Sequence, residues 1–164
     1  MVEIQFCHKE QLGIIGKLAH EIWPLVYDYM ISKDQIAFML NLMYSPGALE
    51  KQWEEGHLFI VIQEKGGDPF GFASFQTTPE GYAKLHKLYL PKNQHGKGYG
   101  RRMLSFIIHQ CQDKKQVELA LNVNRNNKAL AFYLSNGFSI KESVDVAIGN
   151  GYEMNDYIMV KSIL

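Results

Sequence analysis

The chain has 164 residues, 46% of them hydrophobic and 21% charged, and its 17 basic residues balance its 17 acidic residues. This size and composition predict one globular domain over 1–164, and the lack of a basic excess argues against nucleic acid as a partner. No apolar run approaches the ~20 residues that cross a bilayer, so no membrane is expected. Cys7 and Cys111 lie far apart without metal or redox spacing, and no signal-peptide pattern is present, which favours a cytoplasmic protein with reduced thiols.

The first third of the sequence predicts one strand followed by three helices. Apolar periodicity places the strand over 2–7 and the helices over 10–29, 32–45 and 45–56. Pro24 is expected to end the first helix or to begin its successor, because proline removes a helical hydrogen bond. Ser32 and Ser45 stand where the N-caps of the next two helices belong, and Pro46 suits the first position of the last helix.

After residue 56 the pattern changes to strands and helices in mixed order. Strands are predicted over 57–64, 70–76, 82–90, 117–123, 138–148 and 152–161, and helices over 100–112 and 127–137. The first three strands read as an antiparallel meander, and Asn150 with Gly151 is a hairpin turn between the last two. The predicted fold class is α/β (α+β), with a mixed, mostly antiparallel central sheet of six to seven strands flanked by helices.

The stretch "HGKGYGRRML", residues 95–104, leads from a short strand into a helix. Three glycines alternate through it, at Gly96, Gly98 and Gly100. The first N–H groups of a helix have no internal partners, and the helix dipole makes that end positive. Glycines let an anion approach these groups, and Arg101 and Arg102 add positive charge that is unfavourable there without an anion. The stretch therefore predicts a phosphate-binding site, with a flexible glycine-rich turn as the alternative.

Two familiar phosphate motifs do not match this stretch. A Walker loop requires Lys followed by Ser or Thr after its last glycine, whereas Arg101 follows Gly100. A dinucleotide fingerprint has the spacing Gly-x-Gly-x-x-Gly early in a parallel unit, whereas these glycines alternate late in the chain. The pattern therefore argues against nucleotide hydrolysis and dinucleotide redox chemistry, and leaves phosphate binding.

A second motif lies in "NVNRNNKALAFYLSNGF", residues 122–138. Asn126 is expected at the start of a helix, either as a plain N-cap or as a polar group on nearly the same face as Tyr133. Tyr133 taken alone could be a buried aromatic residue with its hydroxyl at the surface. Together with the glycine stretch, the pattern Asn-x-x-Ala-x-x-x-Tyr-x-x-x-Gly-Phe resembles the GCN5-related N-acetyltransferase (GNAT) superfamily. It is matched by Asn126, Ala129, Tyr133, Gly137 and Phe138.

The resemblance covers roughly residues 58–161 and implies the GNAT fold, whose parallel strands splay apart where acetyl-coenzyme A (acetyl-CoA) binds. The family's glycine motif, Gln/Arg-x-x-Gly-x-Gly/Ala, is met except at its first position, where His95 stands. By this resemblance, the pantetheine arm would pair with the backbone of Leu88, Tyr89 and Leu90, and Asn126 would also contact the cofactor. The remaining cofactor contacts would come from His95, Gly96, Lys97, Gly98, Tyr99, Gly100 and Arg101.

The reaction implied by the resemblance is the attack of a neutral amine on the thioester, with a thiolate leaving. Tyr133 would face the sulfur, stabilise the leaving thiolate by a hydrogen bond and also serve as its acid. The amine must first lose a proton, and His86 is the main candidate base because histidine titrates in the right range. An ordinary strand histidine is the alternative. Glu80, His57 and Glu21 are weaker candidates, and a water chain could suffice.

The resemblance thus predicts an acetyl-CoA-dependent N-acetyltransferase acting on a primary amine of a small molecule or a peptide, without a metal ion. The overall order of elements looks somewhat like bacterial polyamine acetyltransferases, which makes a polyamine-like acceptor a candidate. The alternatives are a non-catalytic acyl-CoA sensor or regulatory protein, and an enzyme that uses another acyl donor such as succinyl-CoA. A homodimer is the family's common assembly.

Overall fold

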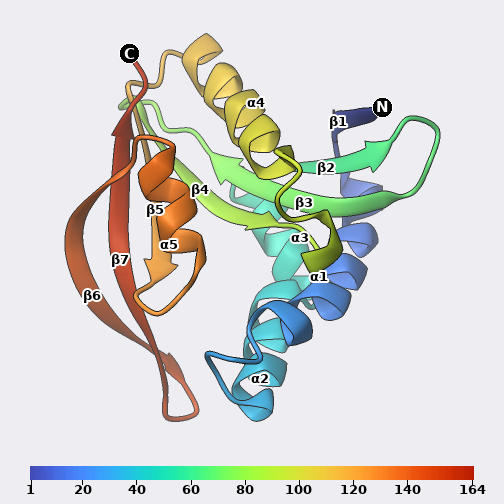
Figure 1. Ribbon diagram of the computed structural model, residues 1–164, viewed down its shortest axis with the longest axis vertical. Coiled ribbons are helices and arrows are strands. Elements are labelled where there is room, and N and C mark those ends of the chain that lie inside the picture. Colours follow the sequence, from blue (N-terminus) through green and yellow to red (C-terminus); the bar gives the residue numbers. More distant parts are fainter. The chain divides into compact units, whose positions relative to one another are not determined.

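The computed structural model describes residues 1–164, which divide into two compact units (Figure 1). One unit consists of Met1–Gln76 and Lys87–Ile107, and the other of Thr77–His86 and Ile108–Leu164. Strand β4 (Tyr82–Tyr89) and helix α4 (Tyr99–Asp113) each contribute residues to both units. None of the helices combines the length and the apolar character that a membrane crossing requires.

The first unit combines a small antiparallel sheet with helices. Its elements, in chain order and besides its parts of β4 and α4, are β1 (Val2–Phe6), the 3₁₀ turn η1 (Lys9–Gln11), α1 (Leu12–Val26), α2 (Lys33–Tyr44), α3 (Pro46–Glu54), β2 (Leu58–Glu64), β3 (Pro69–Gln76) and the 3₁₀ turn η2 (Lys92–Gln94). Strand β2 lies between β1 and β3, with Ile62 opposite Ile4 on one side and Gly71 on the other. A bulge in β3 follows, because the next residue of β2, Gln63, pairs with Pro69.

The helices of this unit begin where the sequence predicts. Ser32 Oγ accepts a hydrogen bond from Gln35 N at 3.1 Å, and Ser45 Oγ accepts one from Ala48 N at 3.3 Å. These two contacts confirm the predicted N-caps of α2 and α3. The prediction for Pro24 is wrong, because α1 continues past it. Pro24 lies in the last turn of α1, so it removes one helical hydrogen bond close to the end of the helix without ending the helix itself.

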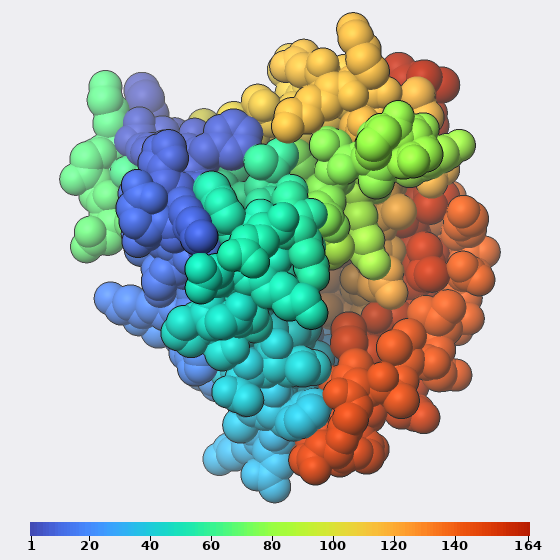
Figure 2. All heavy atoms as spheres, turned by 180° about the vertical axis from the view of Figure 1, so that it is seen from behind, coloured from blue at the N-terminus to red at the C-terminus, as the bar shows by residue number.

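The core of the first unit is built from aromatic and branched side chains. Four consecutive residues of β2, Phe59–Ile62, are buried, so both faces of this strand are covered. Phe72 and Phe75 of β3, Ile15 of α1 and Leu49 of α3 are also among the fully buried side chains. Figure 2 shows the atoms of α1 to α3, in blue to teal, packed against one another. This packing holds β2 and β3 in place. Strand β4 and the loop before α4 follow β3 along the chain.

The second unit is a sheet with one short helix of its own. Besides the first part of β4, its elements are β5 (Glu118–Asn124), α5 (Ala129–Ser135), β6 (Ser139–Gly149) and β7 (Tyr152–Ser162). The strand order is β4-β5-β7-β6, and β7 is antiparallel to both of its neighbours (Figure 1). The β6–β7 hairpin turns at Asn150 and Gly151, whose φ angles of 54° and 78° confirm the predicted turn.

The pairing of β4 with β5 is parallel and short. It joins Tyr82–Leu85 to Glu118–Leu121. The ladder ends at the pair Leu85–Leu121, although β4 continues to Tyr89 and β5 to Asn124. An early end of this ladder is what the predicted splaying of the two strands requires.

Candidate active site

The N-terminus of α4 has the geometry of an anion cradle. Its first helical hydrogen bond runs from Arg102 N to Gly98 O at 3.1 Å, so the preceding N–H groups have no acceptor within the helix. Gly96 and Gly98 adopt left-handed backbone conformations, with φ of 77° and 81°. A Cβ added to either glycine would meet no protein atom within 4 Å. The space beside these two residues is therefore open, at the positive end of the helix dipole.

His95, which departs from the family's usual residue, holds the cradle loop in place. Its Nε2 donates a hydrogen bond to Leu90 O at 2.8 Å, which ties the loop to the segment that follows β4. Its own backbone N–H donates to Lys92 O at 3.1 Å. Beside it, Lys97 Nζ donates to Gln94 Oε1 at 3.2 Å. The imidazole therefore shapes the loop, while the cradle itself consists of backbone.

Two arginines lie in the first turn of α4, and both are exposed. Arg102 Nη2 donates to Val2 O of β1 at 3.3 Å, which attaches the helix to the edge strand of the first unit. Arg101 and Arg102 therefore place two positive charges at the end of the helix where the cradle lies.

The C-terminal end of β4 is fixed by aromatic packing. The ring of Tyr89 lies 5.5 Å from the rings of both Trp23 and Phe72, measured between centroids. Its hydroxyl forms a hydrogen bond of 2.8 Å with the hydroxyl of Tyr27. Leu88, Tyr89 and Leu90 are all half-buried. The backbone predicted to pair with pantetheine is therefore held rigidly by α1 and β3.

β4 carries two adjacent titratable residues, His86 and Lys87, which point to opposite faces of the strand. Lys87 shares the buried positions of Ala83 and Leu85, whereas His86 is half-buried and follows the exposed Lys84 in alternation. Lys87 is only 7% exposed, and burial lowers its pKa from 10.5 to about 8. Lys87 is not among the site residues predicted from the sequence. Its register with the apolar positions of β4 was the signal that could have found it.

The structure corrects the expected position of Asn126. Helix α5 begins at Ala129, so Asn126 lies before the helix and does not share a helical face with Tyr133. The N-cap position is that of Lys128, whose side chain makes no capping contact, and Asn127 Oδ1 accepts a hydrogen bond from Ala129 N at 2.8 Å. Asn126 is exposed, and its N–H donates to Asn124 Oδ1 at 2.9 Å. Neighbouring asparagine side chains can each bond to the backbone of such a turn, and the sequence does not show which of them does so.

Tyr133 is fixed by its own helix and the strand that follows. It is 8% exposed, and its ring lies 5.2 Å from that of Phe132 and 5.6 Å from that of Phe138. Gly137, with φ of 88°, ends α5 as the sequence predicts. The ring of the candidate acid is therefore held in one orientation.

The weaker candidate bases lie in different settings. Glu21 of α1 and Glu80, in the turn before β4, are exposed. His57 is 9% exposed, and its ring stacks on that of Phe59 with 6.3 Å between centroids. The two carboxylates therefore lie in contact with solvent, whereas the His57 ring packs against a core residue.

Asp156 on β7 is a further buried titratable residue, and it was not among the residues predicted from the sequence. It is 3% exposed, and Asn122 Nδ2 donates to its carboxylate at 3.5 Å. Burial raises the pKa of the Asp156 carboxyl, and the contact with Asn122 and the charges of Arg125 and Lys84 oppose that effect. Asp156 is therefore a buried carboxylate within the second unit's sheet.

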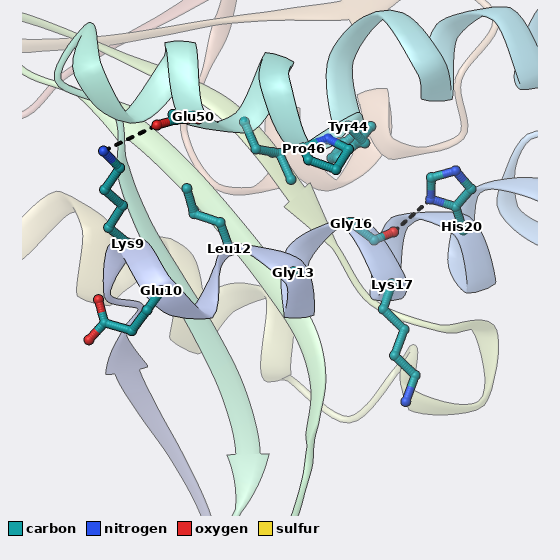
Figure 3. A pocket seen from close by; sticks show the side chains of 11 residues that line it. Lys9, Glu10, Leu12, Gly13, Gly16, Lys17, His20, Tyr44, Pro46 and Glu50 are labelled. Carbon is teal, nitrogen blue, oxygen red and sulfur yellow. Dashed lines mark hydrogen bonds and ion pairs between the residues drawn. The ribbon is translucent and has the colours of Figure 1, made fainter.

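A groove of ≈ 660 Å³ lies between α1 and the corner that joins α2 to α3 (Figure 3). At one end Lys9 Nζ and Glu50 Oε1 form an ion pair of 3.4 Å. At the other end His20 Nδ1 donates to Gly16 O at 2.7 Å. None of the cofactor or catalytic residues predicted from the sequence lines this groove, so it is not where the predicted chemistry lies.

The glycine cradle and the helix that ends at Gly137 lie within a region that matches a known family. A model of the acetyltransferase (GNAT) family matches residues 23–138, more than half of the chain. The chain belongs to the GNAT family. Membership confirms the resemblance that the two motifs indicated, and it makes the chain an N-acetyltransferase with acetyl-CoA as co-substrate.

Solved structures of GNAT proteins share the fold. The PaiA N-acetyltransferase of Thermoplasma acidophilum, solved with coenzyme A, is 24% identical with a TM-score of 0.83, and 99% of each chain is covered. The ribosomal-protein-S18-alanine N-acetyltransferase of Escherichia coli is 19% identical with a TM-score of 0.75, covering 99% of this chain and 94% of that one. These likenesses confirm the predicted GNAT fold, a mostly antiparallel sheet flanked by helices. A comparison with curated protein sequences gives no match.

The residues of this GNAT protein fit the pyrophosphate of acetyl-CoA. The cradle supplies open space beside two left-handed glycines, N–H groups without helical acceptors and a nearby guanidinium. This donor set matches a diphosphate, which offers only acceptor oxygens.

Proposed function

We propose that this GNAT domain, over residues 1–164, transfers the acetyl group of acetyl-CoA directly to a primary amine of a small molecule or a peptide. The main support for this proposal is the cradle at the start of α4. There, Gly96 and Gly98 leave open space before N–H groups that have no acceptor within the helix. A helix N-terminus of this kind binds phosphate groups without further charge, and Arg101 adds to the attraction.

The end of β4 is proposed as the second contact with acetyl-CoA. Leu88, Tyr89 and Leu90 would pair through their backbone with the amide groups of the pantetheine arm. The ring contacts of Tyr89 support this role, because a strand that is already rigid loses little entropy when a ligand pairs with it. Asn126, exposed before α5, would supply a further side-chain contact.

Tyr133 is proposed as the residue that stabilises the leaving sulfur. Acetyl-CoA supplies the acetyl group as a thioester, and in the transfer a carbon–nitrogen bond forms as the carbon–sulfur bond breaks. The Tyr133 hydroxyl would donate a hydrogen bond to the thiolate as it forms and then deliver a proton to it. The proton that the nitrogen loses as the amide forms would return to the phenolate through solvent, so that the protons balance. The ring contacts with Phe132 and Phe138 support the role, because a preorganised donor costs no rearrangement during the reaction.

His86 is proposed as the group that receives the proton of the acceptor ammonium. It lies on β4, directly before the strand end assigned to pantetheine, and it is half-buried. Histidine changes protonation close to neutral pH, as a general base requires. The burial pattern of the strand supports His86 over Glu80 and Glu21, which are exposed.

Two classes of acceptor are compatible with the proposal. Polyamine-like small amines are one class, suggested by the order of elements in the N-terminal half. Peptide N-termini are the other, because the Escherichia coli enzyme that shares the fold is an alanine N-acetyltransferase of ribosomal protein S18. Matched small amines and dipeptides separate the two classes.

The proposed compartment is the cytoplasm. Cys7 and Cys111 are free and buried. Burial raises the pKa of each thiol to about 11, so both stay protonated and unreactive at neutral pH. Such thiols suit a reducing compartment and take no part in the acyl transfer.

The test is the release of free coenzyme A thiol from acetyl-CoA, followed with a thiol reagent across a panel of primary amines. We expect release that depends on the amine, and a much lower rate in Tyr133→Phe. Tyr82→Phe, which removes the hydroxyl of an exposed tyrosine, is the matched control and should keep the wild-type rate. Binding of acetyl-CoA without release on any amine would instead identify a sensor.

A further inference from the structure

Lys87 is a buried ammonium that the chain leaves without a counter-charge. Its residue is 7% exposed, and burial alone lowers its pKa to about 8, with no carboxylate near enough to oppose the effect. The cationic side chains that do form ion pairs in this chain are 29% to 77% exposed. They belong to Lys9, Lys51, Lys92 and Arg125, and the exposed N-terminal ammonium of Met1 is paired as well. Each paired cation is therefore far more accessible than Lys87, which is the only buried lysine and forms no ion pair.

The surroundings of Lys87 are aromatic. Its Nζ lies 5.0 Å from the centre of the Tyr44 ring, within the range of a cation–π contact. The Tyr44 ring packs on Trp23 at 5.4 Å and on Phe72 at 5.8 Å. Burial holds the pKa of the Tyr44 phenol well above its usual range, and the neighbouring Tyr27 adds to the effect, so Tyr44 stays neutral. The aromatic surroundings of Nζ thus attract a cation through the Tyr44 ring but supply no negative charge.

A buried lysine without a counter-charge lowers the stability of the fold, unless a bound ligand supplies that charge. Removing an ammonium from water without an ion pair costs free energy, and one ring contact returns only part of it. An apolar side chain of similar length would fill the same volume without that cost. Packing therefore gives no reason for a charged residue at this position, and a ligand with a negative charge does.

The location of Lys87 indicates which ligands can reach it. It directly precedes Leu88–Leu90, the backbone assigned above to the pantetheine arm, and the thioester is carried at the end of that arm. Lys87 also lies on the face of β4 that is opposite to His86. Lys87 therefore lies on the strand proposed to bind the pantetheine arm, on the face opposite to that of the candidate base.

We propose that Lys87 binds a carboxylate carried by one of the two substrates, either on the amine acceptor or on the acyl chain of the donor. The inference rests on the proposed function, since it concerns the substrates of the same site. It also separates the acceptor classes, because a diamine or polyamine would place a second positive charge near an ammonium that already lacks a partner. An amino acid, a peptide with a free carboxyl group or a dicarboxylic acyl group would supply the missing charge.

The first arm of the test uses acetyl-CoA with acceptors that differ only by a carboxylate. The pairs are L-lysine with cadaverine, L-ornithine with putrescine, and the dipeptide Ala-Gly with its C-terminal amide. Specificity is the ratio of kcat/KM within each pair, measured by thiol release. A charge-assisted contact predicts roughly a tenfold to hundredfold preference for the carboxylate member of the pair that the enzyme accepts.

The second arm compares acetyl-CoA with succinyl-CoA on whichever acceptor the enzyme uses best. It assigns the carboxylate to the acyl chain if succinyl-CoA is preferred by a similar factor. Both arms are repeated with Lys87→Met, which keeps the length of the side chain and removes its charge. Lys84→Met is the matched control, because Lys84 lies on the same strand but is exposed. Melting temperatures verify that both variants are folded.

The inference holds if wild type and Lys84→Met show the preference in either arm and Lys87→Met loses it, mainly through KM. It is overturned if neither arm shows a preference, if diamines are preferred, or if Lys87→Met keeps the wild-type ratio. In those cases thiol release still occurs, so the proposed function stands without it. Absence of thiol release with every acceptor and both donors would contradict the proposed function itself and remove the basis of the inference.

Discussion

Gly98→Ala tests the cradle at a single position. Gly98 has a φ of 81°, and no protein atom lies within 4 Å of the place that an alanine Cβ would occupy. The substitution therefore causes no clash within the protein. It adds backbone strain, and it puts a methyl group into the space that we assign to the pyrophosphate.

The two effects have different sizes and different readouts. A left-handed conformation costs an L-residue about 1–2 kcal/mol, and each 1 kcal/mol lowers Tm by about 2–4 °C for a chain of this length. We therefore expect Tm to fall by about 2–8 °C. Displacing a phosphate oxygen from a charge-assisted hydrogen bond costs about 1.5–3 kcal/mol, which corresponds to roughly 10- to 150-fold weaker binding of coenzyme A.

Gly66→Ala is the matched control for strain. Gly66 lies in the turn between β2 and β3, has a φ of 77°, and also has no atom within 4 Å of an added Cβ. Both variants should lose a similar amount of stability in thermal melts, but calorimetric titration with coenzyme A should show weaker binding only for Gly98→Ala. Equal affinities in the two variants would refute the assignment and leave a glycine-rich turn.

Three further predictions concern side chains. Tyr133→Phe should lower kcat by roughly 100-fold or more if the phenol acts as the acid, while the Kd for acetyl-CoA changes little. A large change in Kd with kcat retained would contradict the role of Tyr133 as the acid. Arg101→Glu should weaken coenzyme A binding by roughly tenfold or more and reduce its salt dependence, whereas Lys65→Glu, the same charge change on an exposed turn residue, should do neither. Lys87→Met should stabilise the fold at pH 7 by up to about 3 kcal/mol, because the folded wild type holds that proton with a pKa of about 8 instead of 10.5. Wild type should recover this deficit as pH rises from about 8 to 10.5, and denaturation curves in which the difference stays constant across that window would contradict the buried charge.

Much of the fold could be predicted from local sequence signals. The caps at Ser32 and Ser45 and the turn at Asn150 and Gly151 depend on residues whose own backbone and hydroxyl chemistry determines the outcome. The effect of Pro24 depends on where the helix ends, and tertiary packing fixes that point. The early end of the β4–β5 ladder could be expected only from the resemblance to GNAT proteins, because no local pattern records how two strands diverge.

In the candidate site, too, local features could be predicted from the sequence and features that depend on tertiary contacts could not. The cradle could be predicted because glycine and the helix dipole act within a few residues. The structural role of His95 could not, since it depends on a contact with Leu90 O across the loop. The burial of Lys87 could not be predicted either. A lysine is normally exposed, and this one is buried by the contact with Tyr44.

The roles of the cradle and of Tyr133 are tested together by the initial rate of amine-dependent thiol release as a function of acetyl-CoA concentration, for wild type, Tyr133→Phe and Gly98→Ala side by side. If both roles are right, release saturates in wild type, the plateau is lower in Tyr133→Phe, and the half-saturation concentration is higher in Gly98→Ala. Release that does not depend on the amine, or three superimposable curves, would contradict both roles.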